Sequence, residues 1–252
     1  MAEPLVSVIM PVYNSERFLE DAIRSVINQI YINWELWLVD DNSTDNSKKL
    51  ITNFTTIDNR IKSIFLTKNS GTAIARNTAI ARSTGKYIAF LDSDDIWLPE
   101  KLSKQISFME VNGHSFTYTW YSVMDENGMD LKQTIKAPAT VTYKQLLKNN
   151  TIGCLTAVYN SDKLGKMLMP DIRKRQDYGL WLNILKTNVV GYGIKEPLAI
   201  YRTGISSLSN KKTNVLKYNW ILLRKYQHLS FFLSLFYFLC FLYNKSIKYL
   251  TK

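Results

Sequence analysis

The chain has 252 residues, 46% of them hydrophobic and 13% aromatic, which excludes a disordered protein and leaves ample length to bury a core. Its formal charge of +11 is unevenly placed, because no aspartate or glutamate follows Glu196 while lysines accumulate there. Such a basic segment suits nucleic acid, an anionic membrane surface or an acidic substrate. The cysteines, Cys154 and Cys240, are far apart, which excludes a disulfide framework and a cysteine zinc site. The first residues lack a signal-peptide pattern, so we expect a cytosolic chain.

The first 95 residues alternate between apolar, strand-like runs and amphipathic helical stretches. The predicted strands cover about 5–10, 34–39, 61–66 and 87–91. The predicted helices cover about 16–29 and 72–83, with another starting at Ser43 or Thr44. We expect Pro11 to end the first strand and Asn14 or Ser15 to cap the first helix. Alternation at this interval predicts an α/β fold with a mostly parallel sheet flanked by helices.

Beyond Pro99 the pattern changes. A helix is predicted over about 100–111 and an aromatic strand over 115–124, followed by a turn at Asn127-Gly128. From there to about Pro197, short strands mix with short helices, which is typical of an α+β arrangement. The sequence indicates no second domain before about residue 210.

The apolar run at 87–91 ends in three acids, Asp92, Asp94 and Asp95. Carboxylates crowded at the end of a buried strand repel one another unless a cation or a set of hydrogen-bond donors compensates. On an extended chain, Asp92 and Asp94 would face one site while Ser93 faces elsewhere. Hard oxygen ligands at that spacing suit Mg²⁺ or Mn²⁺ carrying a substrate phosphate. The alternative is an acidic turn in which Asp95 caps the next helix.

Further candidate ligands follow the other predicted strands. Tyr13 comes after the first strand, and Asp41 comes directly after the second. In parallel sheets, ligands bind beyond the carboxyl ends of the strands, so these residues and the three acids are expected at one edge of the sheet.

Three segments together resemble the inverting family 2 glycosyltransferases of the GT-A fold, in particular bacterial enzymes of surface-polysaccharide biosynthesis. The segments are 6–14 (VSVIMPVYN), 39–45 (VDDNSTD) and 85–95 (GKYIAFLDSDD). The resemblance is strong over the first 110 residues and continues weakly to about Ser209. It implies a GT-A (Rossmann-like) domain over 1–210, with a nucleotide-sugar-binding half at 1–110 and an acceptor-binding half at 111–210, before a C-terminal tail at 211–252.

The resemblance implies how a nucleotide sugar, expected to be a UDP-sugar, would be bound. Tyr13 would stack on or flank the uracil, with Pro11 shaping the loop. Asp41 would accept a hydrogen bond from uracil N3, and Glu16 would lie near the nucleotide. The alternatives are a core-edge aromatic for Tyr13, a helix cap for Asp41 and a first-turn helix acid for Glu16.

Charged residues would complete the donor site in enzymes of this kind. Arg76 would contact the nucleotide or its diphosphate, although a solvated helix charge is the alternative. Asp92 would reach the ribose or the metal, with Ser93 beside it. Asp94 would coordinate Mn²⁺ or Mg²⁺ bridging the diphosphate.

One position departs from the family pattern. Many members carry a histidine after a Tyr-Arg pair as a further metal ligand, whereas Thr203 stands there in this chain. Its two histidines, His114 and His228, are expected to be structural. Positive charge for the diphosphate would come instead from Arg202, Lys211 or Lys212 on a loop that closes over the donor.

The segment 175–181 (RQDYGLW) resembles the family's acidic pair before a helix that carries a tryptophan. By that resemblance Asp177 would deprotonate the acceptor hydroxyl, which attacks the anomeric carbon opposite the leaving UDP and inverts its configuration. No general acid would be needed, because the metal and arginine stabilise the departing diphosphate. The alternative for Asp177 is a simple helix cap.

The C-terminal tail is basic and apolar. Its apolar run over 229–243 has about fifteen residues, short of the about 20 that span a bilayer, and lysines or arginines flank it. We expect a peripheral helix on the anionic cytoplasmic face of the plasma membrane. The alternative is a helix that packs on the domain or on a second subunit, giving a homo-oligomer. By analogy, a lipid-linked oligosaccharide is the expected acceptor.

Two other functions fit parts of the sequence. A sugar nucleotidyltransferase would need a glycine-rich, basic phosphate loop after the first strand, and residues 11–14 (PVYN) offer none. A nucleic-acid or membrane-binding module without catalysis would leave the acidic strand ends unexplained, since they repel phosphates. We therefore expect no nucleic-acid partner. The transferred sugar, the acceptor and the linkage are not determined by the sequence.

Overall fold

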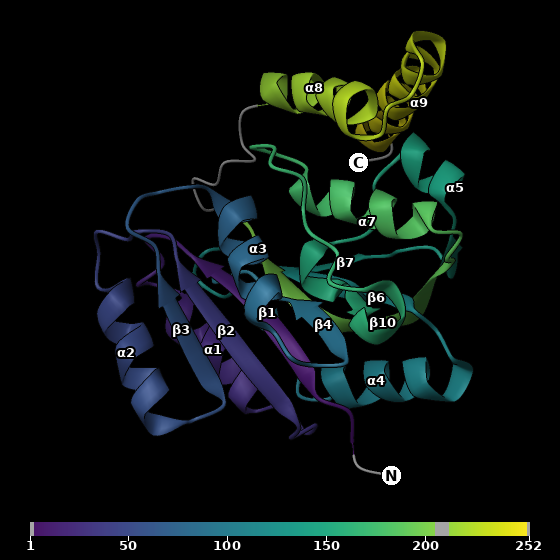
Figure 1. The fold of residues 1–252 in the computed structure, drawn as a ribbon. Helices are drawn as coiled ribbons and strands as arrows, with labels where there is room; N and C mark the ends of the chain where they lie inside the picture. The colour runs from purple at the N-terminus through teal and green to yellow at the C-terminus, as the bar shows by residue number, and fades with distance from the viewer. Residues whose placement is uncertain (1–2, 205–211, 251–252) are drawn as a thin grey trace.

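The structure is a computed structural model that describes residues 3–204 and 212–250. Four strands and three helices alternate in its first part. The strands are β1 (Val6–Val12), β2 (Trp34–Asp40), β3 (Ile61–Phe65) and β4 (Tyr87–Phe90). The helices are α1 (Leu19–Ile27), α2 (Ser47–Ile57) and α3 (Thr72–Arg82). All pairings in the order β3-β2-β1-β4 are parallel, so the predicted parallel sheet is confirmed (Figure 1).

The second part extends the same sheet with mixed pairing. Its strands are β5 (Ile96–Trp97), β6 (Phe116–Met124), β7 (Asp130–Ile135), β8 (Thr140–Val141), β9 (Val158–Asn160) and β10 (Gly191–Arg202). Its helices are α4 (Lys101–Asn112), α5 (Tyr143–Lys148), α6 (Ser161–Leu164) and α7 (Gln176–Lys186), with a 3₁₀ turn at Cys154–Thr156. β9 joins β4 to β6 by antiparallel pairing, whereas β6 and β10 pair in parallel. One α/β sheet therefore runs through both halves.

The core lies on both faces of this sheet. Along β1, Val8 and Met10 pack into one apolar cluster while Ile9 packs into the other, as alternate residues of a strand must. α1 covers the first face and α3 the opposite one, because Ile23 belongs to the cluster of Val8 and Ile80 to the cluster of Ile9. The sheet is thus buried on both sides, as parallel sheets are.

Local boundaries differ from the sequence predictions at three places. Pro11 does not end β1; it pairs with Val39 inside the strand. A proline is tolerated there because β4 pairs with β1 only as far as Ile9, so no neighbour on that side needs its missing N–H. Neither Asn14 nor Ser15 caps α1 as predicted, because no side chain forms a capping hydrogen bond at the start of this helix. α2 begins at Ser47, whose N–H donates to Oδ1 of Asp45.

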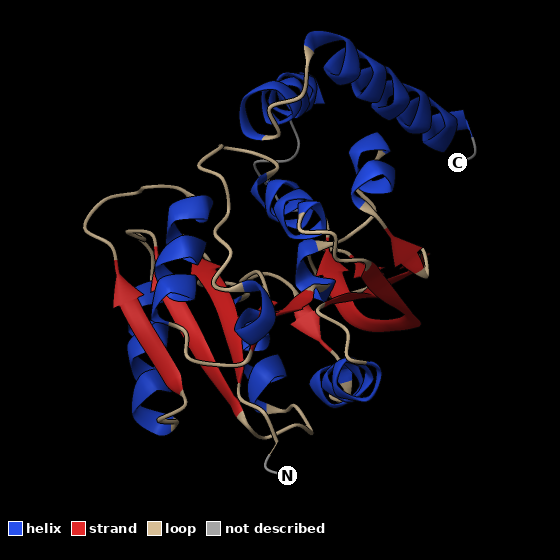
Figure 2. Ribbon diagram, turned by 45° about the vertical axis from the view of Figure 1, so that its right-hand side comes forward, coloured by secondary structure: helices blue, strands red, loops and turns tan. Residues whose placement is uncertain are grey.

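The tail is built into the domain. It comprises α8 (Lys212–Ile221), a π-helical turn (Leu222–Tyr226) and α9 (Phe231–Leu250). Leu222 and Leu223 are fully buried in the main core cluster, which Tyr237 of α9 also joins. Figure 2 shows α8 and α9 beyond the end of the sheet towards which the arrows of the first strands point. Removing the chain after residue 214 would therefore take away core side chains, as the alternative of a tail that packs on the domain implies.

α9 nevertheless leaves one side uncovered. Its large apolar side chains on that side are Phe232, Leu235, Phe236, Leu239 and Tyr243, each between 38% and 81% exposed. We call these five residues the outer face of α9. The opposite side, with Ser234, Tyr237 and Phe241, is buried. Within residues 3–204 and 212–250, none of the helices is both long and apolar enough to cross a bilayer.

Lys101, at the start of α4, is fully buried. Its ammonium donates to Oε1 of Gln105 at 2.6 Å and lies 4.4 Å from the ring centre of Trp97. In the part of the chain that the structure describes, no carboxylate pairs with it. Burial lowers the pKa of Lys101 to about 7, because desolvation disfavours the charged form.

This buried lysine predicts a pH-dependent stability. Between pH 7 and about 10.4 the unfolded chain binds a proton that the folded protein does not, so the free energy of unfolding should rise with pH, by at most about 1.4 kcal/mol per pH unit. Lys101→Met should abolish this rise and stabilise the protein at pH 7 by about 1–3 kcal/mol. Urea unfolding at pH 7 and pH 9.5 measures both effects. Lys104→Met, on the exposed side of the same helix, is the control. A Lys101→Met protein that is destabilised at both pH values would contradict the prediction.

Candidate active site

The acidic segment after β4 forms a turn, in which the N–H of Asp95 donates to the carbonyl of Asp92 at 3.1 Å. The extended backbone assumed for it was therefore wrong, but the expected sidedness holds. Asp92 and Asp94 reach the surface, whereas Ser93 and Asp95 are buried. Asp95 does not cap the next helix; its carboxylate accepts the backbone N–H of Arg202 at 3.0 Å.

Burial and mutual repulsion dominate the electrostatics of this turn. Burial, and then the neighbouring charge of Asp92, raise the pKa of Asp94 to about 6. Burial and the two neighbouring acids also raise the pKa of Asp95 well above its ordinary value. The turn therefore holds more carboxylate than its surroundings neutralise.

Two buried arginines lie against the acids. Arg76 on α3 is only 4% exposed and forms an ion pair with Asp92, so it is not a solvated helix charge. Arg202 at the end of β10 donates from Nε to the backbone carbonyl of Asp94 at 3.0 Å, and its Nη2 lies 3.3 Å from Oδ2 of Asp21. Neither arginine forms an ion pair with the carboxylate of Asp94 among the described residues, although both charges lower its pKa in part. The two other cations predicted for the diphosphate, Lys211 and Lys212, lie outside the side chains that the structure describes.

Asp41 follows β2 and is 3% exposed. Its two carboxylate oxygens accept the backbone N–H groups of Ser70 and Gly71, each at 2.7 Å. Gly71 is the residue before α3 and has φ of +92°, which a residue with a Cβ rarely adopts. Asp41 thus fixes the start of the helix that carries Arg76.

The loop after β1 brings the remaining predicted donor residues together. Tyr13 is 49% exposed, so its ring is available at the surface, while Pro11 is buried in the strand below. The hydroxyl of Ser15 lies 2.8 Å from that of Ser93, which links this loop to the acidic turn. Glu16 is not in α1; its carboxylate accepts the backbone and side-chain N–H groups of Asn46, each at 2.8 Å. The loops after β1, β2 and β4 are therefore tied to one another.

Asp177 lies in the first turn of α7 and is half-buried. The N-cap position of α7 is Arg175, and the backbone N–H of Tyr178 in the first turn acts on the carboxylate of Asp177, so a role at the helix start stays an alternative. Burial raises the pKa of Asp177, the charges of Arg76 and Arg175 oppose that rise, and Asp92 adds to it. Asp177 and the acidic turn thus share one electrostatic environment.

Sequence reasoning missed three residues of this site. The rings of Tyr121 on β6 and Tyr201 on β10 meet edge to face with centres 6.1 Å apart, and both are half-buried. Burial raises the pKa of Tyr121 to about 12, to which the charges of Asp95 and Asp177 contribute. Burial also raises the pKa of the Cys154 thiol; the charge of Arg76 lowers this pKa, and the charges of Asp92 and Asp177 raise it. No sequence signal marks these three residues, because only the pairing of distant strands brings them to the acids.

The histidines contribute nothing to the acidic turn. His114 stacks on Tyr192, with ring centres 3.6 Å apart, and also contacts Phe108. His228 has φ of +54° and follows the π-helical turn. Among the described residues, no three histidine, cysteine or acidic side chains are grouped as a metal site.

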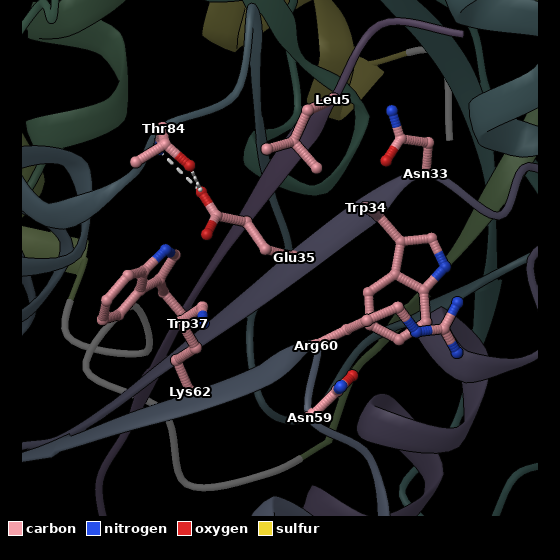
Figure 3. A pocket seen from close by; sticks show the side chains of 9 residues that line it. All are labelled: Leu5, Asn33, Trp34, Glu35, Trp37, Asn59, Arg60, Lys62 and Thr84. Carbon is pink, nitrogen blue, oxygen red and sulfur yellow. Dashed lines mark hydrogen bonds between the residues drawn. The ribbon is translucent and has the colours of Figure 1, made fainter. Parts of the chain in front are cut away.

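A hollow lies at the opposite, amino-terminal end of the sheet (Figure 3). Two of its charged side chains, Glu35 and Arg60, are already paired, although the indole N–H groups of Trp34 and Trp37 have no hydrogen-bond partner among the described residues. Glu35 accepts from Ser7 and from the backbone and hydroxyl of Thr84, and Arg60 stacks 3.7 Å from the ring centre of Trp34 while pairing with Asp58. Ligands of parallel sheets bind at the carboxyl ends, so we assign this hollow a structural role.

Solved structures share the fold. The chain superposes on S. aureus TarS in complex with UDP-GlcNAc with a TM-score of 0.73 at 19% identity, covering 94% of this chain and 71% of TarS. A mannosyltransferase from Pyrobaculum calidifontis, solved with GDP-Man and Mn²⁺, gives a TM-score of 0.66 at 16% identity over 91% of this chain and 66% of that protein. These likenesses confirm the predicted GT-A fold.

Curated relatives are closer in sequence. The chain is 43% identical to the "Putative teichuronic acid biosynthesis glycosyltransferase TuaG" of Bacillus subtilis, over 91% of each chain. It is also 43% identical, over 87% of this chain and 85% of the relative, to WfgD of Escherichia coli, a UDP-Glc:alpha-D-GlcNAc-diphosphoundecaprenol beta-1,3-glucosyltransferase. The sequence model of the family described as Glycosyl transferase family 2 matches residues 7–163. The chain therefore belongs to glycosyl transferase family 2, as its strand-end motifs predict.

Proposed function

We propose that this enzyme transfers a sugar from a UDP-sugar, with inversion, to a hydroxyl of a sugar that is linked to a membrane lipid through a diphosphate. One observation carries the proposal: the under-neutralised acidic turn and the half-buried Asp177 share one environment at the carboxyl edge of the sheet. We assign donor binding to residues 1–110 and acceptor binding to 111–210, with Tyr13, Asp41 and Glu16 on the nucleotide side.

The acidic turn fits a divalent cation. Asp94 has a pKa raised by burial and by Asp92, and a cation would relieve both effects. Two carboxylates are fewer ligands than Mn²⁺ or Mg²⁺ needs, which is usual where substrate phosphates and waters complete the shell. Asp94 and Asp92 would hold the ion. Once bound, it would supply a Lewis acid for the leaving diphosphate.

The protein's own groups would do the rest of the chemistry. Arg76 and Arg202 add positive charge under the diphosphate position, which favours departure of UDP. Asp177 would take the proton of the acceptor hydroxyl as that oxygen attacks the anomeric carbon. Its raised pKa makes it a stronger base than an exposed aspartate. The half-buried rings of Tyr121 and Tyr201 would support the sugar between the two sites.

Two relatives support the choice of acceptor class. WfgD acts on a diphosphoundecaprenol-linked sugar by its name, and TuaG is named for teichuronic acid biosynthesis. An acceptor of this kind lies at a membrane surface. The outer face of α9, with Arg224 and Lys225 exposed at the preceding turn, would bind anionic lipid on the cytoplasmic side without crossing it.

A donor and acceptor screen tests the proposal. Purified protein is incubated with a panel of nucleotide sugars and a synthetic alkyl-diphosphate-linked N-acetylglucosamine, and UDP release and the anomeric configuration of the product are measured. We expect one UDP-sugar to give acceptor-dependent UDP release with an inverted linkage. Retention of configuration, or no transfer from any donor to this acceptor, would overturn it.

The metal role predicts the behaviour of Asp94→Ala. The variant should fold normally, because removing a carboxylate from a crowded turn relieves repulsion. Mn²⁺-dependent UDP binding, measured by calorimetry, should weaken at least about 100-fold, and EDTA should produce the same loss in the unaltered protein. The exposed Asp162→Ala is the control. Unchanged UDP affinity in Asp94→Ala would remove the metal from this turn.

The base role predicts the behaviour of Asp177→Asn. An amide keeps the shape of the side chain but takes no proton, so kcat should fall by roughly 10²–10⁴ while the affinity for UDP stays within about twofold. Because burial raises the pKa of Asp177, activity should be lost on acidification at a higher pH than an exposed aspartate would give. Asp171→Asn, on the exposed loop before α7, is the control. A variant with most of its turnover intact would show that the base lies elsewhere.

The membrane role predicts the effect of polar substitutions on the outer face of α9. A triple variant of Phe232, Phe236 and Leu239 to serine leaves the core intact and should weaken sedimentation with phosphatidylglycerol vesicles by roughly 10²-fold, since each side chain loses about 1 kcal/mol of partial burial. UDP binding should not change. Ile57→Ser, equally apolar and 77% exposed on α2, is the control. If the triple variant still sediments fully, α9 does not face the membrane.

A further inference from the structure

Lys174 and Arg175, shortly before Asp177, form no ion pair with an acid among the described residues. The ammonium of Lys174 is buried, and no hydrogen-bond acceptor contacts it in the described part of the chain. The guanidinium of Arg175 lies over the rings of Tyr178 and Phe241, at 5.8 Å and 5.3 Å from their centres, and pairs with no acid among the described residues. The arginines under the acidic turn differ, because each of those reaches a carboxylate.

This arrangement is unfavourable in the absence of a ligand. A buried ammonium without a partner loses hydration and regains nothing for it. Arg175 also has φ of +72°, a left-handed conformation that is unfavourable for a residue with a Cβ. Such strain persists where the surrounding structure imposes it, and it is concentrated at binding sites.

The position of the pair relates it to both the base and the membrane. Asp177 is two residues beyond Arg175, and their charges act on each other. Phe241, the ring beneath Arg175, belongs to the buried side of α9, whose outer face is apolar. The order of carboxylate, cation and apolar helix thus holds for Asp177, Arg175 and α9, and Lys174 is next to Arg175 in the sequence. A sugar hydroxyl, a diphosphate and a lipid chain follow one another in the same order.

We propose that Lys174 and Arg175 bind the diphosphate of the lipid-linked acceptor, at a site separate from that of the donor diphosphate. The inference rests on the proposed function, since it presupposes a diphosphate-linked acceptor. The planar guanidinium contacts two phosphate oxygens and the ammonium a third. The acceptor hydroxyl is thereby placed beside Asp177, and Phe241 holds the guanidinium in position from below.

The kinetic experiment compares two acceptors that carry the same sugar, one joined to its alkyl chain through a diphosphate and one as a plain alkyl glycoside. Lys174→Met combined with Arg175→Gln should lower kcat/KM for the diphosphate acceptor by roughly 10²-fold. Its kcat/KM for the glycoside and its KM for the donor should stay within about twofold. Lys62→Gln, an exposed lysine on β3, should change neither.

Each other outcome is decisive. Equal losses with both acceptors would show a structural role, and a raised donor KM would place the cations on the donor diphosphate; either result overturns the inference. Lys174→Met alone controls for folding, because removing an unpaired buried charge should not lower Tm. A binding assay keeps the inference separate from the proposed function. Farnesyl diphosphate, added to protein saturated with UDP and Mn²⁺, should bind the unaltered protein and bind the double variant at least 10-fold more weakly. Equal binding would overturn the site even if transfer is never observed.

Discussion

Three carboxylates in one turn require positive charge beside them, and the two guanidiniums that provide it come from opposite parts of the chain. Arg76 reaches Asp92 from α3, while Arg202 meets the turn from the last strand of the sheet. Each guanidinium is almost completely buried, so its charge would be costly without the acids, and the acids would repel one another more strongly without the guanidiniums. The acidic turn is therefore where the parallel first half and the mixed second half of the sheet depend on each other.

The charge balance in this cluster is unequal, and the inequality gives the site its chemistry. Arg76 is taken up by Asp92, and Arg202 by a backbone carbonyl and by Asp21. Burial and the charge of Asp92 raise the pKa of Asp94 to about 6, because the charges of Arg202 and Arg76 oppose that rise only in part. Burial in the same environment raises the pKa of Asp177, so its carboxylate has the affinity for a proton that the proposed base needs. In the proposed mechanism, Asp94 in this set of buried charges would bind a cation, and Asp177 would take a proton.

The sequence was sufficient where the signal is local. Strand periodicity located β1 to β4 to within two residues at each end, and the residues that end those strands carried the family assignment. Prediction from the sequence failed where a contact between distant parts of the chain decides where an element ends or which residues meet. Pro11 continues β1 because the pairing of β4 with β1 has already ended at Ile9. At the start of α2, the carboxylate of Asp45 accepts the N–H of Ser47, whereas the helix was predicted to start at Ser43 or Thr44. Tyr121 and Tyr201 reach the site only through the pairing of β6 with β10, which no local pattern encodes. The sequence also does not show that the ammonium of Lys174 is buried without a partner, because Lys174 stands between two arginines and looks like part of an exposed basic segment.

The tail shows why an apolar run cannot be interpreted from composition alone. A helix that packs on protein and a helix that lies on lipid both need large apolar side chains, so the sequence admitted either. α9 has such side chains on both sides, one buried against the domain and one exposed. Because Phe241 on the buried side lies under Arg175, two residues from Asp177, the outer face has a fixed orientation relative to this proposed base. A rigid contact of this kind, unlike a flexible linker, would set the depth at which a lipid-linked hydroxyl meets Asp177.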